Sequence, residues 1–71
     1  MSRGNPVPVI QVGTLLVSND YMVRNNKLLS GVILEVKDDL WGWNHHVYLS
    51  NGTTHWMDER RIRDLFEVVP P

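Results

Sequence analysis

The dipeptide Asn51-Gly52 lies between the extended segments "HHVYLS" and "TTHWM" and constrains the fold more than any other feature of the sequence. Both central residues of a type I′ turn need positive φ angles, which Asn and Gly tolerate best. The sequence therefore predicts a hairpin with a two-residue turn. In that register Tyr48 lies opposite His55.

The predicted register assigns every side chain of the hairpin to one face of a sheet, because facing residues on paired strands share a side. Val47 lies opposite Trp56, which predicts that this tryptophan belongs to the core. The expected core face consists of Val47, Leu49, Thr54 and Trp56. The expected opposite face consists of His46, Tyr48, His55 and Met57.

The first half of the chain indicates two more strands. The apolar, β-branched segment 12–17 predicts a strand, and the turn-forming residues at 18–27 predict a long loop after it. Residues 30–39 alternate with a period of two, which predicts a second strand. Its expected faces are Val32, Leu34 and Val36 on one side and Ile33, Glu35 and Lys37 on the other.

The C-terminal segment predicts a helical turn followed by a last strand. Asp58 is placed to cap a turn at residues 59–61, and "LFEVV" at 65–69 has the composition of a strand. A longer amphipathic helix over 58–67 is the alternative, but its length is marginal for a helix. We therefore expect the short turn.

Length and composition limit the chain to one small domain. With 71 residues it is near the lower size at which a chain buries enough apolar surface to fold unaided. It has no cysteine, so neither disulfides nor thiolate-bound zinc can support the core. Pro6 and Pro8 predict an extended N-terminal arm at residues 1–10, and we expect the domain to span residues 11–71.

This order of elements resembles the small Src-homology-3-like barrels, the group that includes Tudor, chromo-barrel and KOW-type modules. The resemblance covers roughly residues 10 to 69 and rests on "VGTLLV", "GVILEV", "VYLSNGTTHWM" and "DLFEVV". It implies an all-β fold, a small five-stranded barrel with a short helical turn before the last strand. The same segments also resemble small, mostly uncharacterised proteins of tailed bacteriophages.

The aromatic residues predict a partner-binding surface. Relatives of the barrel type bind peptides or methylated lysines where the first loop and the turn after the second strand approach each other, and their aromatic rings supply cation–π attraction. Tyr21, Trp41 and Trp43 occupy these positions here, with Asp38 or Asp39 as a charge partner and Tyr48 as a further ring. The alternative is that Trp41 and Trp43 cover an open end of the barrel as part of the core.

Basic residues suggest a second kind of surface. The resemblance to KOW-type modules implies contacts with nucleic acid, for which the candidates are Arg24, Lys27, Arg60, Arg61 and Arg63. The net charge is only −1, and acidic residues at 58, 59, 64 and 67 are interleaved with the arginines. Because counterion release needs several unopposed cations, we rank nucleic acid below a protein partner.

The sequence offers little for catalysis or metal binding. His45 and His46 are adjacent and would point to opposite faces of a strand, and no carboxylate stands at ligand spacing beside them. We therefore expect surface histidines, no metal site, no cofactor and no catalytic residues. An enzyme whose active site forms between subunits is a third class without support from particular residues.

Together these patterns predict a non-enzymatic protein-interaction module, plausible as a phage-encoded component of the virion or a host-interacting protein. The N-terminal segment has no signal-peptide layout, and no stretch approaches the ~20 apolar residues of a membrane span. We expect a cytoplasmic or virion location, no secretion and no membrane partner. A small core without disulfides also favours self-association.

Overall fold

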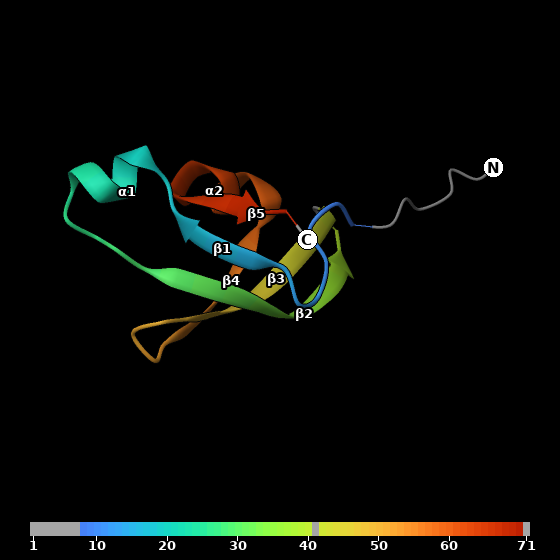
Figure 1. Ribbon diagram of the computed structural model, residues 1–71. Coiled ribbons are helices and arrows are strands. Elements are labelled where there is room, and N and C mark those ends of the chain that lie inside the picture. Colours follow the sequence, from blue (N-terminus) through green and yellow to red (C-terminus); the bar gives the residue numbers. More distant parts are fainter. Residues whose placement is uncertain (1–7, 41, 71) are drawn as a thin grey trace.

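The computed structural model describes residues 8–40 and 42–70, which form one antiparallel sheet and two short helices (Figure 1). The elements are β1 (Leu15–Ser18), α1 (Asp20–Arg24), β2 (Ser30–Asp39), β3 (Gly42–Leu49), β4 (Thr54–Asp58), α2 (Glu59–Leu65) and β5 (Phe66–Val69). The strands are arranged in the order β4-β3-β2-β1-β5, and each neighbouring pair is antiparallel. The prediction of five strands is confirmed.

The sheet is open, so the predicted closed barrel is wrong. Strands β4 and β5 are the two edges of the sheet and do not pair with each other. Helix α2 joins these two strands in sequence and contacts both of them. Its Ile62 is fully buried. A helix with a buried side chain thus occupies the place where direct pairing of the edge strands would have closed a barrel.

Helix α2 is longer than the predicted turn at 59–61. The predicted cap is confirmed, because the Asp58 carboxylate accepts a hydrogen bond from the Arg61 backbone N–H at 2.8 Å. One turn later Arg63 Nε donates to Glu59 Oε2 at 2.8 Å, an i,i+4 pair that supports a helix. Burial of Ile62 adds tertiary packing to these local contacts. A prediction from helix length alone does not include this packing, so it underestimates the length of α2.

The predicted loop at 18–27 contains the five-residue helix α1. Asn19 caps it, since its side-chain oxygen accepts a hydrogen bond from the Met22 N–H at 3.0 Å. The same side chain donates to the Asp64 carbonyl oxygen at 2.8 Å, and the Asn19 backbone N–H donates to the Leu65 carbonyl oxygen at 3.0 Å. One residue therefore starts α1 and ties it to the end of α2.

The first strand begins later than predicted. Thr14 N–H donates to the Gln11 carbonyl oxygen at 3.0 Å, which closes a turn where the sequence predicted a strand from residue 12. Gly13 has φ +90°, a left-handed conformation that favours glycine and is incompatible with a regular strand. Strand β1 consequently starts at Leu15.

The hairpin between β3 and β4 has a three-residue loop instead of the predicted two-residue turn. Gly52 N–H donates to the Leu49 carbonyl oxygen at 2.9 Å, and Leu49 N–H donates to the Thr53 carbonyl oxygen at 2.8 Å. Gly52 has φ +88°, whereas Asn51 does not have a positive φ. This is a type I turn followed by a left-handed glycine, the usual three-residue hairpin loop. The Asn51 side chain accepts hydrogen bonds from Thr53 N and Oγ1.

The additional loop residue moves the register of β4 by one position. Tyr48 lies opposite Thr54 and His46 lies opposite Trp56, where the sequence predicted His55 and Val47 as the partners. A one-residue shift transfers every side chain of a strand to the other face. The predicted core position of Trp56 is therefore wrong, and its side chain is 44% exposed.

Strand β2 covers residues 30–39 as predicted, but a bulge interrupts its alternation. Ile33 lies opposite Val47 and Glu35 lies opposite His46, so Leu34 is an extra residue on β2. Ile33 is buried, Val36 packs on the core and Leu34 is exposed. The predicted faces of this strand are therefore wrong, because the bulge returns Val36 to the side of Ile33.

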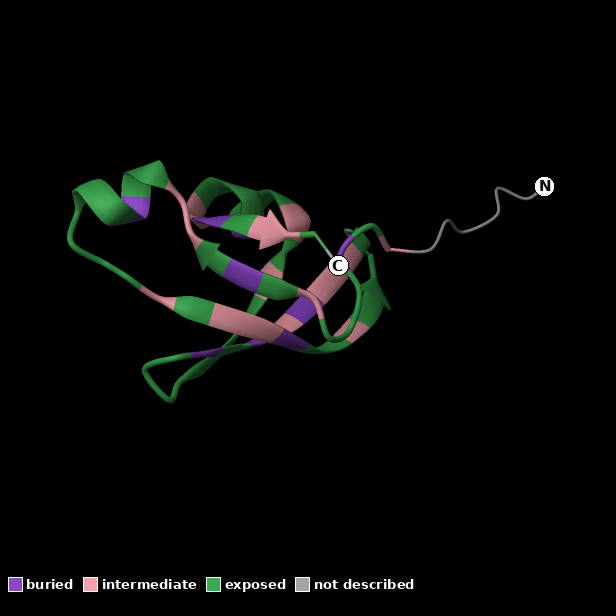
Figure 2. Cartoon of the chain, in the orientation of Figure 1, coloured by how far each residue is buried: buried purple, intermediate pink, exposed green. Residues whose placement is uncertain are grey.

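The core lies on the inner face of the sheet beneath the two helices. Exposed and buried residues alternate along β1 in Figure 2. The buried hydrophobic side chains are Ile10, Leu16, Met22, Ile33, Val47, Leu49, Ile62 and Phe66. Ile10 belongs to the predicted arm at 1–10, yet it packs in the core, so the packed domain includes residue 10. Residues 1–7 of that arm lie outside the described residues.

The buried position of Ile62 predicts a large cost for its truncation. We expect Ile62→Ala to lower the free energy of unfolding by about 2–5 kcal/mol, because a side chain with 0% exposure leaves a cavity between α2 and the sheet. Thermal denaturation measures the change. The matched control is Leu40→Ala, at a position 92% exposed, for which we expect a change within about 0.5 kcal/mol. Equal effects at both positions would contradict the packing of α2 described above.

Candidate functional site

A row of side chains crosses all five strands on the outer face of the sheet, opposite the core. Val69 on β5 lies opposite Leu15 on β1, and Leu15 lies opposite Val32 on β2. Val32 in turn lies opposite Tyr48 on β3, and the row ends with Thr54 on β4. Leu15 is 54% exposed and Tyr48 is 45% exposed. Four of the five side chains in this row are apolar or aromatic. Neither helix covers Leu15.

Three shallow hollows adjoin one another along this face, with volumes of about 550, 500 and 340 Å³. The first two share Leu15 and Val69, and the second and third share Val17 and two serines. We call nine of the apolar side chains that line them the outer strip; Leu16, Leu29 and Val68, which belong to the core or pack against it, and Pro70 are not part of it. Its residues are Val9, Val12, Leu15, Val17, Val23, Leu28, Val32, Tyr48 and Val69.

The outer strip is free of charge. Among the described residues, none that lines the three hollows is an Asp, Glu, Lys or Arg, although the sequence has fifteen such residues, seven basic and eight acidic. The polar lining residues include Ser30 and Ser50, which bind each other through backbone and hydroxyl groups. Glu67 lies opposite Val17 on the edge strand β5, so this carboxylate is on the outer face beside the strip. An uncharged apolar surface with a polar rim is typical of the centre of a protein interface.

Trp56 lies beside the outer strip and is supported by its neighbours on the sheet. Its ring stacks on His46 with centroids 4.6 Å apart and an interplanar angle of 7°. Lys37 Nζ lies 5.4 Å from the centroid of the same ring, a cation–π contact, and 3.7 Å from Glu35 Oε2. The tryptophan is therefore a surface ring with a fixed orientation.

The predicted aromatic site is distributed over separate parts of the described structure. Tyr21 is 61% exposed on α1, and Trp43 is half-buried at the start of β3. Figure 1 places α1 at one end of the sheet and the β2–β3 turn at the other, so these two rings do not meet. Asp39 ends β2 opposite Gly42, close in sequence to Trp43. Trp41 lies outside the described residues.

Tyr48 has a different environment from the other predicted partner-binding residues. It lies in the middle of the outer face and lines the hollow of about 500 Å³ together with Leu15 and Val32. The resemblance predicts Tyr48 as a further ring of the aromatic site around Tyr21. The structure instead groups it with aliphatic residues from β1, β2 and β5.

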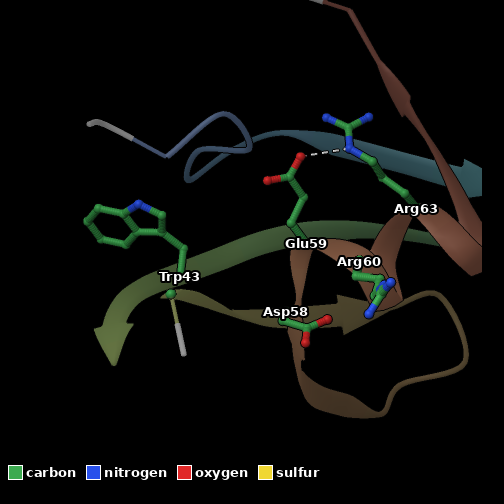
Figure 3. A pocket seen from close by; sticks show the side chains of 6 residues that line it. Trp43, Asp58, Glu59, Arg60 and Arg63 are labelled. Atoms are coloured by element: carbon green, nitrogen blue, oxygen red, sulfur yellow. Dashed lines mark hydrogen bonds and ion pairs between the residues drawn. The ribbon is translucent and has the colours of Figure 1, made fainter. Parts of the chain in front are cut away.

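Trp43 lies at a different hollow, of about 590 Å³, that mixes charges of both signs (Figure 3). The other side chains around it are Asp58, which ends β4, and Glu59, Arg60 and Arg63 of α2. Arg63 is bound to Glu59, and Asp58 caps the helix. The opposing charges reduce the field that these arginines could offer to a phosphate backbone.

The remaining basic candidates do not extend this hollow. Arg61 lines another small hollow with Trp56 and Met57, while Arg24 ends α1 and Lys27 follows it. All the described basic candidates are exposed. They are distributed over α1, the loop after it and α2, and they alternate with acidic residues on α2.

The three histidines have separate environments. His45 is 1% exposed, which contradicts the expectation of a surface residue. Its Nδ1 donates to the Met57 carbonyl oxygen at 2.9 Å, so a hydrogen bond to the facing strand satisfies the buried imidazole. His46 points to the other face, as predicted, and stacks on Trp56. In the part of the chain that the structure describes, no three His, Asp or Glu side chains gather as metal ligands would.

Comparisons with protein-family models, with curated proteins and with solved structures find no match for this chain. Neither of the described helices has the length and apolar character needed to cross a membrane. The outer strip is the feature that sequence reasoning missed. Its signal was the alternation in "LLVS" and "GVI", but combining those residues with Tyr48 and Val69 requires the pairing of four strands.

The surface position of Trp56 predicts a small effect of its removal. We expect Trp56→Ala to lower the free energy of unfolding by about 0.5–1.5 kcal/mol, the range for losing one aromatic stacking contact. Phe66→Ala is the matched control, because that ring is 3% exposed and its truncation should cost about 3–5 kcal/mol. Urea denaturation of both variants measures the difference. A cost for Trp56→Ala as large as that for Phe66→Ala would contradict the surface position of Trp56 and would support the predicted two-residue turn, which places this ring in the core.

Proposed function

We propose that this protein is a non-enzymatic protein-interaction module that binds its partner across the outer strip. The observation that supports this is the continuous, charge-free apolar surface over β5, β1, β2 and β3. Leaving such a surface in water is unfavourable by roughly 25 cal/mol per Å² of apolar area, and a partner removes that cost. Its side chains are aliphatic except for Tyr48, and they offer packing area to a partner.

The proposal extends to the class of fold. The chain has five antiparallel strands, a long first connection, a hairpin between the third and fourth strands and a helix before the last strand. This is the order of elements on which the resemblance to Src-homology-3-like modules rests. We propose an open variant of that architecture, in which α2 separates the two edge strands. The phage resemblance suggests a role in the host cytoplasm or in the virion.

The nucleic-acid alternative has weaker support. It depends on Arg24, Lys27 and the three arginines of α2, and the carboxylate of Glu59 already binds Arg63 at 2.8 Å. Affinity for phosphate backbones scales with the number of cations that release counterions. A surface with alternating charge offers few of them.

Substitution of Leu15 tests the proposed function. We expect Leu15→Lys to reduce the protein captured by the tagged chain at least tenfold, because a buried charge at the centre of an apolar interface costs about 1.4 kcal/mol or more. The measurement is quantitative co-purification from extract of the native host, with a second, differently tagged copy of the chain included. The matched control is Leu40→Lys, the same change at a position 92% exposed and outside the outer strip. Equal capture by both variants would contradict the proposal.

A further inference from the structure

We infer that the partner of the outer strip is a second copy of this chain, in a two-fold symmetric dimer that packs sheet face against sheet face. This inference rests on the proposed function and names the occupant of the same surface. Three properties of the strip favour self-association over binding of a different protein: its charge, its surface shape and its extent.

The charge of the strip suits a symmetric contact. In a two-fold interface the same patch is present on both subunits, so any charge near the axis meets its own copy and is repelled. None of the described residues lining the three hollows is charged, and the nearest carboxylate that the register places on this face, Glu67 opposite Val17, lies on the edge strand β5. The strip therefore meets itself without repulsion. It also lacks the charges by which interfaces usually select a different partner.

The surface shape of the strip is self-complementary. Leu15 and Tyr48 project from the sheet with 54% and 45% of their surface exposed, and the hollow of about 500 Å³ lies between them over Val32. In face-to-face sheets the side chains of one sheet fit between those of the other at a spacing of about 10 Å. A projecting Leu15 of one copy can occupy the hollow of the other, and the symmetry repeats the contact.

The strip reaches across most of the sheet. A standard interface covers roughly 800 Å² on each partner. This is about a sixth of the 5095 Å² that the chain exposes, and the strip extends across four of the five strands and the loops beside them. The core has only eight buried hydrophobic residues among those described and no disulfide supports it. Burial of the strip between two copies enlarges the apolar interior of each.

The oligomeric state of the full chain tests the inference. We expect the weight-average mass in sedimentation equilibrium to rise from the monomer mass of 8.2 kDa towards twice that value as the protein concentration increases from low to high micromolar. We expect Leu15→Lys to raise the dimer dissociation constant at least tenfold, because the two new lysines meet near the symmetry axis. Leu40→Lys should leave the constant unchanged. Thermal denaturation of each variant verifies that it is folded.

A measurement on the unmodified chain keeps the test decisive if Leu15→Lys does not fold. Methyl resonances of Leu15, Val17 and Val69 should shift with concentration, and a mixture of labelled and unlabelled chains should give intermolecular contacts between these methyl groups. A chain that is monomeric at every concentration would overturn the inference. So would a dimer whose intermolecular contacts exclude the outer strip.

The two proposals fail in different ways. If the chain is monomeric and Leu15→Lys abolishes its capture of another protein, the dimer inference is wrong and the proposed protein-interaction module is supported. A monomeric chain whose capture does not depend on Leu15 would overturn both.

Discussion

The pairing of β2 with β3 is the constraint on which the rest of the structure depends. It is the longest pairing in the sheet and contains the bulge at Leu34. The extra residue lets Ile33 and Val36 face the core on one strand while Val47 and His45 do so on the other. Without it, a strict alternation would turn either Ile33 or Val36 towards solvent. The same pairing places Val32 beside Tyr48 on the outer face and thereby begins the outer strip.

The helices explain why the sheet remains open. Helix α2 connects the edge strands β4 and β5 and contacts both, with Ile62 fully buried, so packing on a helix replaces pairing of the two edges. Asn19 then couples the helices, since it caps α1 and binds the Asp64 and Leu65 carbonyl oxygens of α2. The inner face is covered in this way, whereas on the outer face Val23 of α1 is the one described helical residue that lines the strip. The proposed interface is a direct consequence of that asymmetry.

Much of the fold was predictable because local chemistry determines it. The strand at 30–39, the hairpin at Asn51-Gly52 and the cap at Asp58 all appear where the sequence placed them. The errors arose where a local pattern permits two structures. Asn-Gly suits both a two-residue and a three-residue loop, and the choice depends on how β4 packs, with Gly52 alone taking the left-handed conformation. Helix α2 was underestimated because the burial of Ile62 contributes stability that a seven-residue segment lacks by itself.

The candidate site was less predictable than the fold. Of the residues chosen from the sequence for a protein partner, Tyr48 lines the outer strip, while Tyr21 and Trp43 lie at opposite ends of the sheet. By itself the sequence determined the number of strands, because backbone preferences and side-chain periodicity act over a few residues. The tertiary structure alone decided which faces those strands present. A bulge or one extra loop residue reverses a face, and only long-range packing of Val47, Ile62 and their neighbours selects between the alternatives.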